Sequence, residues 1–176
     1  MNLLLLDADV IIDLHRLGVW GKIIEKNRVF ISSIILHQEV YFYRDADGTR
    51  HEIDLKTGLG NKFYEISAEA SALHGFCAMF DTVFSEEIHD GEKEALCLMK
   101  SRGDLAFCTC DKMAIKALSI LDLAERGISF ELLLRQSGIT KKNLEPKHTE
   151  SWFQRFLKEG SIMKIQGVGL SKPWKI

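Results

Sequence analysis

Short apolar runs alternate with longer amphipathic segments along this chain, and the alternation constrains its fold more than any other feature. Strand-like runs cover residues 3–6, 28–33, 62–67 and 105–110. The segments between them carry apolar residues at helical spacing. Strands that alternate with helices pair in parallel, and helices then cover both faces of the sheet. The sequence therefore predicts an α/β fold in three layers, α/β/α, around a central parallel sheet.

The helices are expected where apolar residues recur every three or four positions. One follows the first strand, and others cover residues 34–44, 68–80, 89–102 and 111–127. Thr149 is a suitable N-cap for a last helix over 150–160. This last helix has a single apolar face, made by Trp152, Phe153, Phe156 and Leu157. We expect that face to dock on the body of the protein or on a second copy of it.

Length and composition are those of one globular domain. The chain has 176 residues, of which 46% are hydrophobic and 27% charged. No apolar stretch approaches the roughly 20 residues of a membrane span, and the run at 3–6 lacks a basic leader. The four cysteines lie in apolar stretches without the spacing of a zinc site. A cytoplasmic protein without membrane association is the expectation.

Two regions depart from the alternating pattern, the segment over 44–62 and the C-terminal end of the chain. Residues 44–62 are polar and rich in glycine, and the pair Asp47–Gly48 is typical of a turn. This segment is expected to be a hairpin or loop inserted between core elements. We divide the chain into a domain over 1–135, which contains the insertion, and a C-terminal helical extension over 136–176 packed on the same domain.

Charge is distributed unevenly along the chain. The net charge is −2, yet residues 140–176 hold eight Lys and Arg against three acids, a local charge of +5. A basic end that also carries aromatic residues is typical of nucleic-acid contact, although a solvated helix face has the same composition. The candidate phosphate contacts are Lys141 and Lys142 in this end and Arg44, Arg50, Lys56 and Lys62 in the insertion.

Two aspartates follow predicted strands directly. Asp7 ends the run "LLLL", and Asp111 follows the run "LAFCTC". In an open parallel sheet, ligands bind outside the carboxyl ends of the strands. Both side chains are therefore expected at the same edge of the sheet.

Two glutamates on predicted helices can join these aspartates. Glu92 lies about 50° from the centre of the apolar face of its helix, whereas Glu94 lies about 110° away and is expected in water. Glu39 shares an apolar stripe with Ile35 and Phe42. Each acid alone has a structural explanation, as a helix cap or an ion-pair partner. Four converging carboxylates would repel one another unless a cation neutralised them, and oxygen ligands favour Mg²⁺ or Mn²⁺.

The ordered fragments that carry these acids resemble PIN-domain nucleases. They are "LLLLDADVIIDL", "ISSIILHQEV", "DGEKEALCLM" and "CTCDKMAIKAL", within roughly residues 1–125. The resemblance implies a Rossmann-like α/β/α sandwich and an acidic pocket that binds one or two Mg²⁺ or Mn²⁺ ions. It implies Asp7, Glu39, Glu92 and Asp111 as catalytic and metal-binding residues, with Asp9 and Thr109 in support. Many members are ribonucleases, including toxins of the VapC type that pair with an antitoxin, so RNA, an antitoxin and a second copy of the chain are candidate partners.

Three features depart from a small toxin of this family: the glutamate in "GEKEAL" in place of an aspartate, the insertion and the C-terminal extension. Two other functions fit parts of the sequence. A haloacid-dehalogenase-like phosphatase also places Asp-x-Asp after an apolar strand, and the chain has this pattern at Asp7–Asp9 and again at Asp45–Asp47. A PIN-like fold can also serve as a binding or regulatory module without catalysis.

Overall fold

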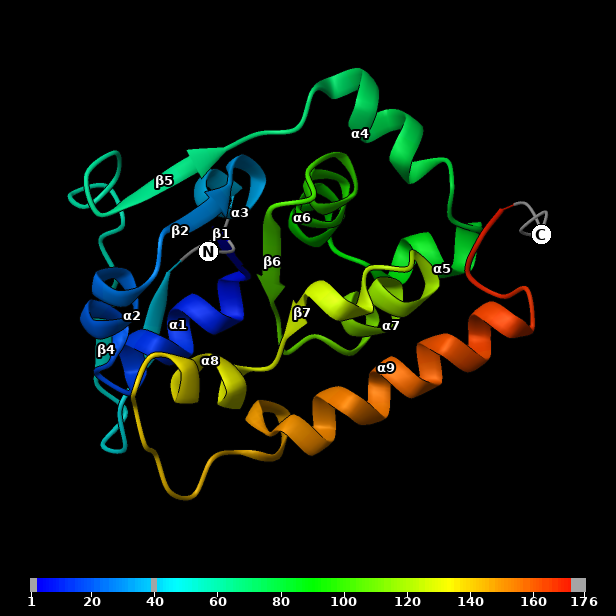
Figure 1. Cartoon of the computed structure of the whole chain (residues 1–176). Helices are drawn as coiled ribbons and strands as arrows, with labels where there is room; N and C mark the ends of the chain where they lie inside the picture. The colour runs from blue at the N-terminus through cyan, green and yellow to red at the C-terminus, as the bar shows by residue number, and fades with distance from the viewer. Residues whose placement is uncertain (1–2, 39–40, 172–176) are drawn as a thin grey trace.

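Five parallel strands form the central sheet of the protein, whose computed structural model describes residues 3–38 and 41–171 (Figure 1). The strands are β1 (Leu3–Leu6), β2 (Val29–Ser32), β5 (Phe63–Ile66), β6 (Leu105–Cys108) and β7 (Gly127–Ile128). Their order across the sheet is β5-β2-β1-β6-β7, and every neighbouring pair is parallel. The prediction of an α/β fold with a central parallel sheet is confirmed, and four strands coincide with the predicted runs. The fifth, β7, is only two residues long and was not predicted.

Helices connect these strands. They are α1 (Ala8–Arg16), α2 (Trp20–Lys26), α3 (Ser33–Gln38), α4 (Ala70–Cys77), α5 (Thr82–Glu87), α6 (Asp90–Ser101), α7 (Lys112–Ile120), α8 (Phe130–Gln136) and α9 (Glu150–Ile165). Successive residues of a strand point to opposite faces of a sheet. Leu5 accordingly packs with residues of α6, α7 and α9, whereas Leu4 and Leu6 pack with residues of α1, α3 and α8. The sheet therefore has a separate hydrophobic core on each face.

The segment after α3 differs from the predicted helix over 34–44. The helix ends at Gln38, and residues 42–44 form strand β3 (Phe42–Arg44). This strand pairs antiparallel with β4 (Arg50–Glu52), across a turn in which Gly48 has a φ of 88°. The aromatic residues of β3 favour a strand, and a positive φ is accessible to glycine. The predicted hairpin in the insertion is thus confirmed, but it begins before residue 44.

The helix predicted over 111–127 is also shorter than expected. It ends at Ile120, and Asp122 turns the chain with a φ of 60°. The apolar spacing continues past this point, but β7 must lie beside β6. Because residues 127–128 belong to the sheet, the chain has to leave the helix and return. Gly127 permits the returning chain to pass close to α7, since a Cβ at this position would lie 2.7 Å from a side-chain carbon of Leu118.

The C-terminal helix α9 lies along α7 (Figure 1). Phe153, Phe156 and Leu157 are buried in the contact, and Trp152 is half-buried. At Gly160 a Cβ would lie 2.4 Å from the Lys116 carbonyl oxygen, so the two helix backbones approach very closely. The Ser119 hydroxyl donates a hydrogen bond of 2.7 Å to the Leu157 carbonyl oxygen. The extension therefore packs on the body through the apolar face expected from its sequence.

Even α9, with 16 residues, is too short and too polar to cross a bilayer, and the same holds for the other helices within residues 3–38 and 41–171.

Candidate active site

A pocket of about 430 Å³ opens at the carboxyl edge of the sheet. Its walls come from the first turns of α1 and α6, from α3 and from the residue that precedes α7. The lining residues are Asp7, Ala8, Asp9, Ile34, Ile35, Gln38, His89, Asp90, Gly91, Glu92 and Asp111. Three of the four acids singled out in the sequence therefore share one pocket. The fourth, Glu39, lies outside the described residues, directly after Gln38 of the pocket wall.

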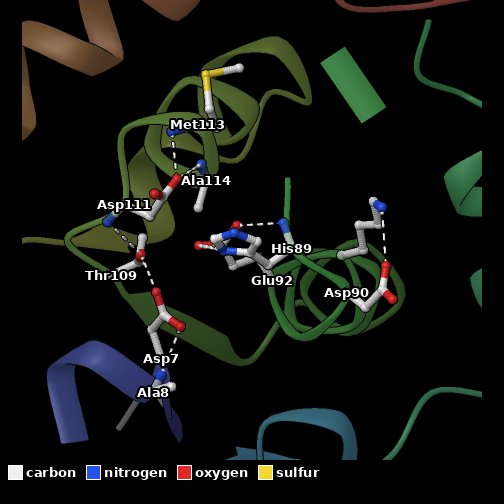
Figure 2. Close-up of polar contacts among 10 residues, drawn as sticks. Asp7, Ala8, His89, Asp90, Glu92, Thr109, Asp111, Met113 and Ala114 are labelled. Carbon is white, nitrogen blue, oxygen red and sulfur yellow. Dashed lines mark hydrogen bonds and ion pairs between the residues drawn. The ribbon is translucent and has the colours of Figure 1, made fainter. Parts of the chain in front are cut away.

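A single threonine holds the two strand-end aspartates together (Figure 2). The buried Thr109 hydroxyl donates a 2.6 Å hydrogen bond to Asp7 Oδ2 and accepts a 3.0 Å bond from the Asp111 backbone N–H. Asp7 and Asp111 also cap helices: Asp7 Oδ1 accepts from Ala8 N at 2.7 Å, and Asp111 Oδ1 accepts from Met113 N and Ala114 N. Because β1 and β6 are adjacent and in register, both caps fall at the same edge.

Burial makes Asp7 a difficult group to ionise. Its side chain is 6% exposed, and desolvation raises its pKa to about 6. The hydrogen bonds from Thr109 and Ala8 lower the pKa, but the negative charges of Asp9 and Asp111 raise it further. The causes of this shift include no cationic side chain of the described residues. Elsewhere in the pocket, Asp90 forms a 3.1 Å ion pair with Lys93, and the His89 ring Nδ1 lies 3.9 Å from Glu92 Oε1.

Glu92 reaches the same pocket from the first turn of α6 (Figure 2). Its side chain is buried, and Oε2 accepts a 3.0 Å hydrogen bond from the His89 backbone N–H. Burial, followed by the charges of Asp7 and Asp111, raises its pKa to about 9. The preceding Gly91 lets α6 approach α3, because a Cβ there would lie 2.5 Å from an Ile35 side-chain carbon. The pair "GE" therefore combines a close helix contact with an inward carboxylate.

The expectation that Glu94 lies in water is wrong. Its side chain is 3% exposed and accepts hydrogen bonds from Ile34 N at 2.7 Å and Ala68 N at 3.1 Å. Helix α6 packs against α3, α4 and α7 as well as the sheet, so nearly all of its circumference is covered. Glu94 thereby fixes the backbone just after β2 and β5, and through Ile34 it helps to place the wall of the pocket.

Asp9 lies at the mouth of the pocket. It is exposed in the first turn of α1, two residues beyond Asp7, and its charge contributes to the raised pKa of Asp7. The other Asp-x-Asp sequence, Asp45–Asp47, lies in the turn of the hairpin, where both carboxylates accept hydrogen bonds from Thr49 N. Only the Asp7–Asp9 pair follows a strand of the sheet, as a phosphatase of the haloacid-dehalogenase type would require.

The chemistry of these side chains suits a hard divalent cation. No three His, Cys, Asp or Glu side chains among the described residues form a ready-made metal cage. Asp7, Glu92 and Asp111 nevertheless offer only oxygen donors, and both bonds to Asp111 go to Oδ1, leaving Oδ2 without a described hydrogen-bond donor. A cation would also offset the repulsion that raises the pKa of Asp7 and Glu92. If an ion binds, these three residues would hold it.

The basic residues proposed from the sequence are all exposed, and none of them lines the pocket. Arg50 pairs with Glu52 and lies 4.0 Å from the Phe42 ring centroid, while Arg44 donates to the Gly48 carbonyl oxygen. Lys141 donates to the carbonyl oxygen of Leu17, at the far end of α1. Ten residues of helix separate Leu17 from Asp7, a distance of about 15 Å. Lys141, Lys142, Arg44 and Arg50 can therefore contact only parts of a substrate that extend beyond the pocket.

A second buried carboxylate, which sequence reasoning missed, lies on the same helix as Asp7. Asp13 accepts a 2.7 Å hydrogen bond from His148 Nε2 and forms ion pairs of 2.8 Å with Lys147 and Arg16. Burial raises its pKa, but the bonds and charges of His148 and Lys147 prevail and lower it to about 2. These four residues, with Phe130 stacked on His148, form a clamp between α1 and the extension. We call Asp13, Arg16, Lys147 and His148 the α1 clamp.

Comparisons of the chain with protein-family models, with curated proteins and with solved structures find no match.

Proposed function

We propose that this protein is a Mg²⁺- or Mn²⁺-dependent nuclease of the PIN-domain type that hydrolyses phosphodiester bonds in single-stranded RNA. One observation carries the proposal: three carboxylates from three separate segments line one pocket, and burial and mutual repulsion raise the pKa of two of them. The strand-end position of Asp7 and Asp111 supports it, because open α/β sheets bind ligands there. Acids that are costly to keep together are typical of functional sites.

The residues have distinct parts in such a reaction. Asp7, Glu92 and Asp111 would hold the cation, which when bound supplies charge neutralisation and an activated water. Thr109 keeps Asp7 and Asp111 at a fixed spacing through its two hydrogen bonds. Gly91 and Glu94 set the positions of α6 and α3. Asp9, exposed at the mouth, is placed to orient water or a ligand near Asp7.

Cleavage of labelled single-stranded RNA tests this function directly. We expect cleavage with Mn²⁺ or Mg²⁺ and none with EDTA. Asp7→Asn and Glu92→Gln should each reduce the rate more than about 100-fold, since loss of a residue that merely supports a metal ligand already costs 10–100-fold. Glu86→Gln removes the same charge from the exposed surface of α5 and should have no effect.

Failure of the wild-type protein to cleave RNA with either ion would contradict the proposal. Cleavage of DNA but not RNA would keep the metal-dependent nuclease and change its substrate. Hydrolysis of p-nitrophenyl phosphate with a phosphate trapped on Asp7 would instead identify a phosphatase. RNA binding without turnover would identify a binding module.

The resemblance extends the proposal to a toxin that pairs with an antitoxin and forms a homodimer in the cytoplasm. Co-expression with a small protein encoded by the neighbouring gene should then abolish RNA cleavage. Light scattering during gel filtration measures the oligomeric state. A monomer that stays active beside that protein would remove the toxin role and leave the nuclease.

A further inference from the structure

The C-terminal extension, whose role the sequence does not assign, contacts both sides of the acid pocket. On one side, its residues 147 and 148 join α1 in the α1 clamp. On the other, α9 packs along α7, which begins immediately after Asp111. Residues 147 and 148 belong to the loop that leads from α8 into α9 (Figure 1). Each contact involves one lysine, and neither lysine is among the residues that line the pocket.

Lys112 is the lysine on the α7 side. It directly follows Asp111, it is exposed, and within the described ranges it forms no ion pair with a carboxylate. A cation in the first turn of a helix is opposed by the helix dipole, so local electrostatics do not explain it. Its Nζ lies 5.5 Å from the Trp152 ring centroid and 5.9 Å from that of Phe156. Cation–π attraction to these two rings holds the ammonium group against α9, on the residue next to Asp111 but outside the residues that line the pocket.

Lys147 is the lysine on the α1 side. Its Nζ lies 2.8 Å from Asp13 Oδ2, and its side chain remains 33% exposed. Asp13 and Asp9 are one helical turn apart on the same face of α1, and Asp9 lines the pocket. Although burial lowers the pKa of Lys147, the hydrogen bond to Asp13 and the charges of Asp13 and Asp9 raise it. The ammonium group therefore stands close enough to Asp9 to interact with it.

The acidic side chains of this pocket repel the phosphates of a nucleic acid. The walls carry Asp7, Asp9, Asp90, Glu92 and Asp111, and those of them that are ionised repel the phosphates next to the one that reacts. Cations immediately beside the acids would offset this repulsion, and phosphate neutralisation supplies much of the affinity of nucleic-acid binding. Lys141 contacts Leu17 at the far end of α1, whereas Lys147 contacts Asp13 within that helix.

We propose that Lys112 and Lys147 bind the phosphates on either side of the cleaved bond, and that the C-terminal extension completes the nucleic-acid site by supplying Lys147 and by holding Lys112 against Trp152 and Phe156. This rests on the proposed nuclease function and names the part of the substrate that the two sides of the pocket recognise. The ligand is the sugar-phosphate backbone of a single strand. Trp152 is a positioning residue, since it acts through Lys112.

Binding of a fluorescent single-stranded oligoribonucleotide tests the lysines, with Ca²⁺ in place of Mg²⁺ so that binding is measured without turnover. Lys112→Gln and Lys147→Gln should each weaken binding about 3- to 10-fold near 0.1 M salt and reduce the slope of log K against log salt by about 0.7 to 1. Lys158→Gln is the matched control, because Lys158 is exposed on α9 and, among the described residues, takes no part in the α1 clamp or in the contact with Lys112. It should bind as wild type does.

Two further variants separate contact from fold. Lys147→Arg keeps the charge and should restore the salt slope, even if loss of the lysine bond to Asp13 lowers the melting temperature. Trp152→Leu should weaken binding without changing the slope, and it should have no added effect in a Lys112→Gln background. A matching DNA strand shows whether the 2′-hydroxyl contributes.

The outcomes are distinguishable. If wild type binds and cleaves the strand but both lysine variants match Lys158→Gln, the two-lysine site is wrong and the nuclease stands. If wild type neither binds nor cleaves single strands, both proposals fall. A stability loss in Lys147→Gln with an unchanged salt slope would restrict Lys147 to the α1 clamp.

Discussion

Asp7 and Asp13 stand near opposite ends of helix α1, and burial has opposite consequences for them. Both side chains are about 95% buried. The pKa of Asp7 is raised to about 6 by burial and by neighbouring acids. The pKa of Asp13 is lowered to about 2, because the hydrogen bonds and charges of His148 and Lys147 outweigh burial. The partner, and not the depth of burial, decides whether a buried carboxylate stabilises the folded state.

The difference separates a ligand site from a structural contact. In the α1 clamp the folded protein itself supplies the cations, so Asp13 is satisfied without a ligand. In the pocket, burial and repulsion between Asp7, Glu92 and Asp111 raise the pKa of Asp7 and of Glu92. The clamp therefore adds to stability and the pocket reduces it, and the proposed cation would recover part of that loss.

The largest effect on stability is expected from breaking the α1 clamp. Asp13→Ala leaves Lys147, His148 and Arg16 without their shared anion and should lower the free energy of unfolding by about 3 kcal/mol. Urea denaturation at pH 7 measures it. Asp104→Ala is the control, since this exposed acid pairs with Arg102 at the surface and its loss should cost far less. Equal losses in the two variants would show that the clamp is no more than a surface ion pair.

Cation binding should stabilise the pocket and leave the clamp unchanged. At a Mn²⁺ concentration about 100 times the dissociation constant, wild type should gain roughly 2.7 kcal/mol. For a chain of this size the melting temperature would rise by about 5–10 °C. Asp7→Asn should show little of this gain. A rise of the same size in Asp7→Asn would exclude a site that depends on Asp7.

The pH dependence of stability should have opposite signs in the two regions. Glu92 has an ordinary pKa of 4.5 in the unfolded chain and about 9 in the folded protein. Between these values the unfolded state ionises first, so metal-free wild type should lose stability as pH rises from about 5 to 9. Glu92→Gln should remove the part of this loss that Glu92 causes and should be more stable than wild type at pH 8.

Asp13 should make stability depend on pH in the opposite direction. Its stabilising contribution is complete above the ordinary pKa of 3.8 and is lost as pH falls toward about 2. The stability difference between wild type and Asp13→Ala should therefore shrink in acid. Denaturation curves in EDTA from pH 2 to 9 measure both trends, and parallel curves for wild type and Glu92→Gln would refute the buried repulsion.

The smallest effect is expected at Asp9, which is exposed and belongs to neither set of buried partners. Asp9→Asn removes one charge near Asp7 and should change the free energy of unfolding by less than about 0.5 kcal/mol. A larger gain in metal-free protein would mean that the charge of Asp9, which raises the pKa of Asp7 more than that of Asp111 does, costs more than an exposed charge usually does. Thermal melts in EDTA distinguish these cases.

Local sequence was sufficient for the strands and for the edge at which the acids lie. An apolar run that ends in an aspartate marks both β1 and β6, because a buried strand must emerge before a charged group can be tolerated. Thr149 and Asp111 were recognisable as caps from residue type alone, and each side chain accepts from the first turn of its helix. The ends of the two helices predicted to reach residues 44 and 127 could not be recognised from the sequence. In both places, strand pairing with β4 or β6 overrides the helical spacing of the apolar residues.

What the sequence determined by itself is the alternation of strands and helices, and with it the edge that receives Asp7 and Asp111. Only the tertiary structure decided which acids have partners. Glu94 is buried because α6 is covered on nearly every side, and Asp13 is paired because residues 135 positions away return to α1. Helical periodicity in a sequence indicates which residues share one apolar face and which are close neighbours along the chain. The energy of a buried charge depends instead on groups that only folding brings within a few ångströms.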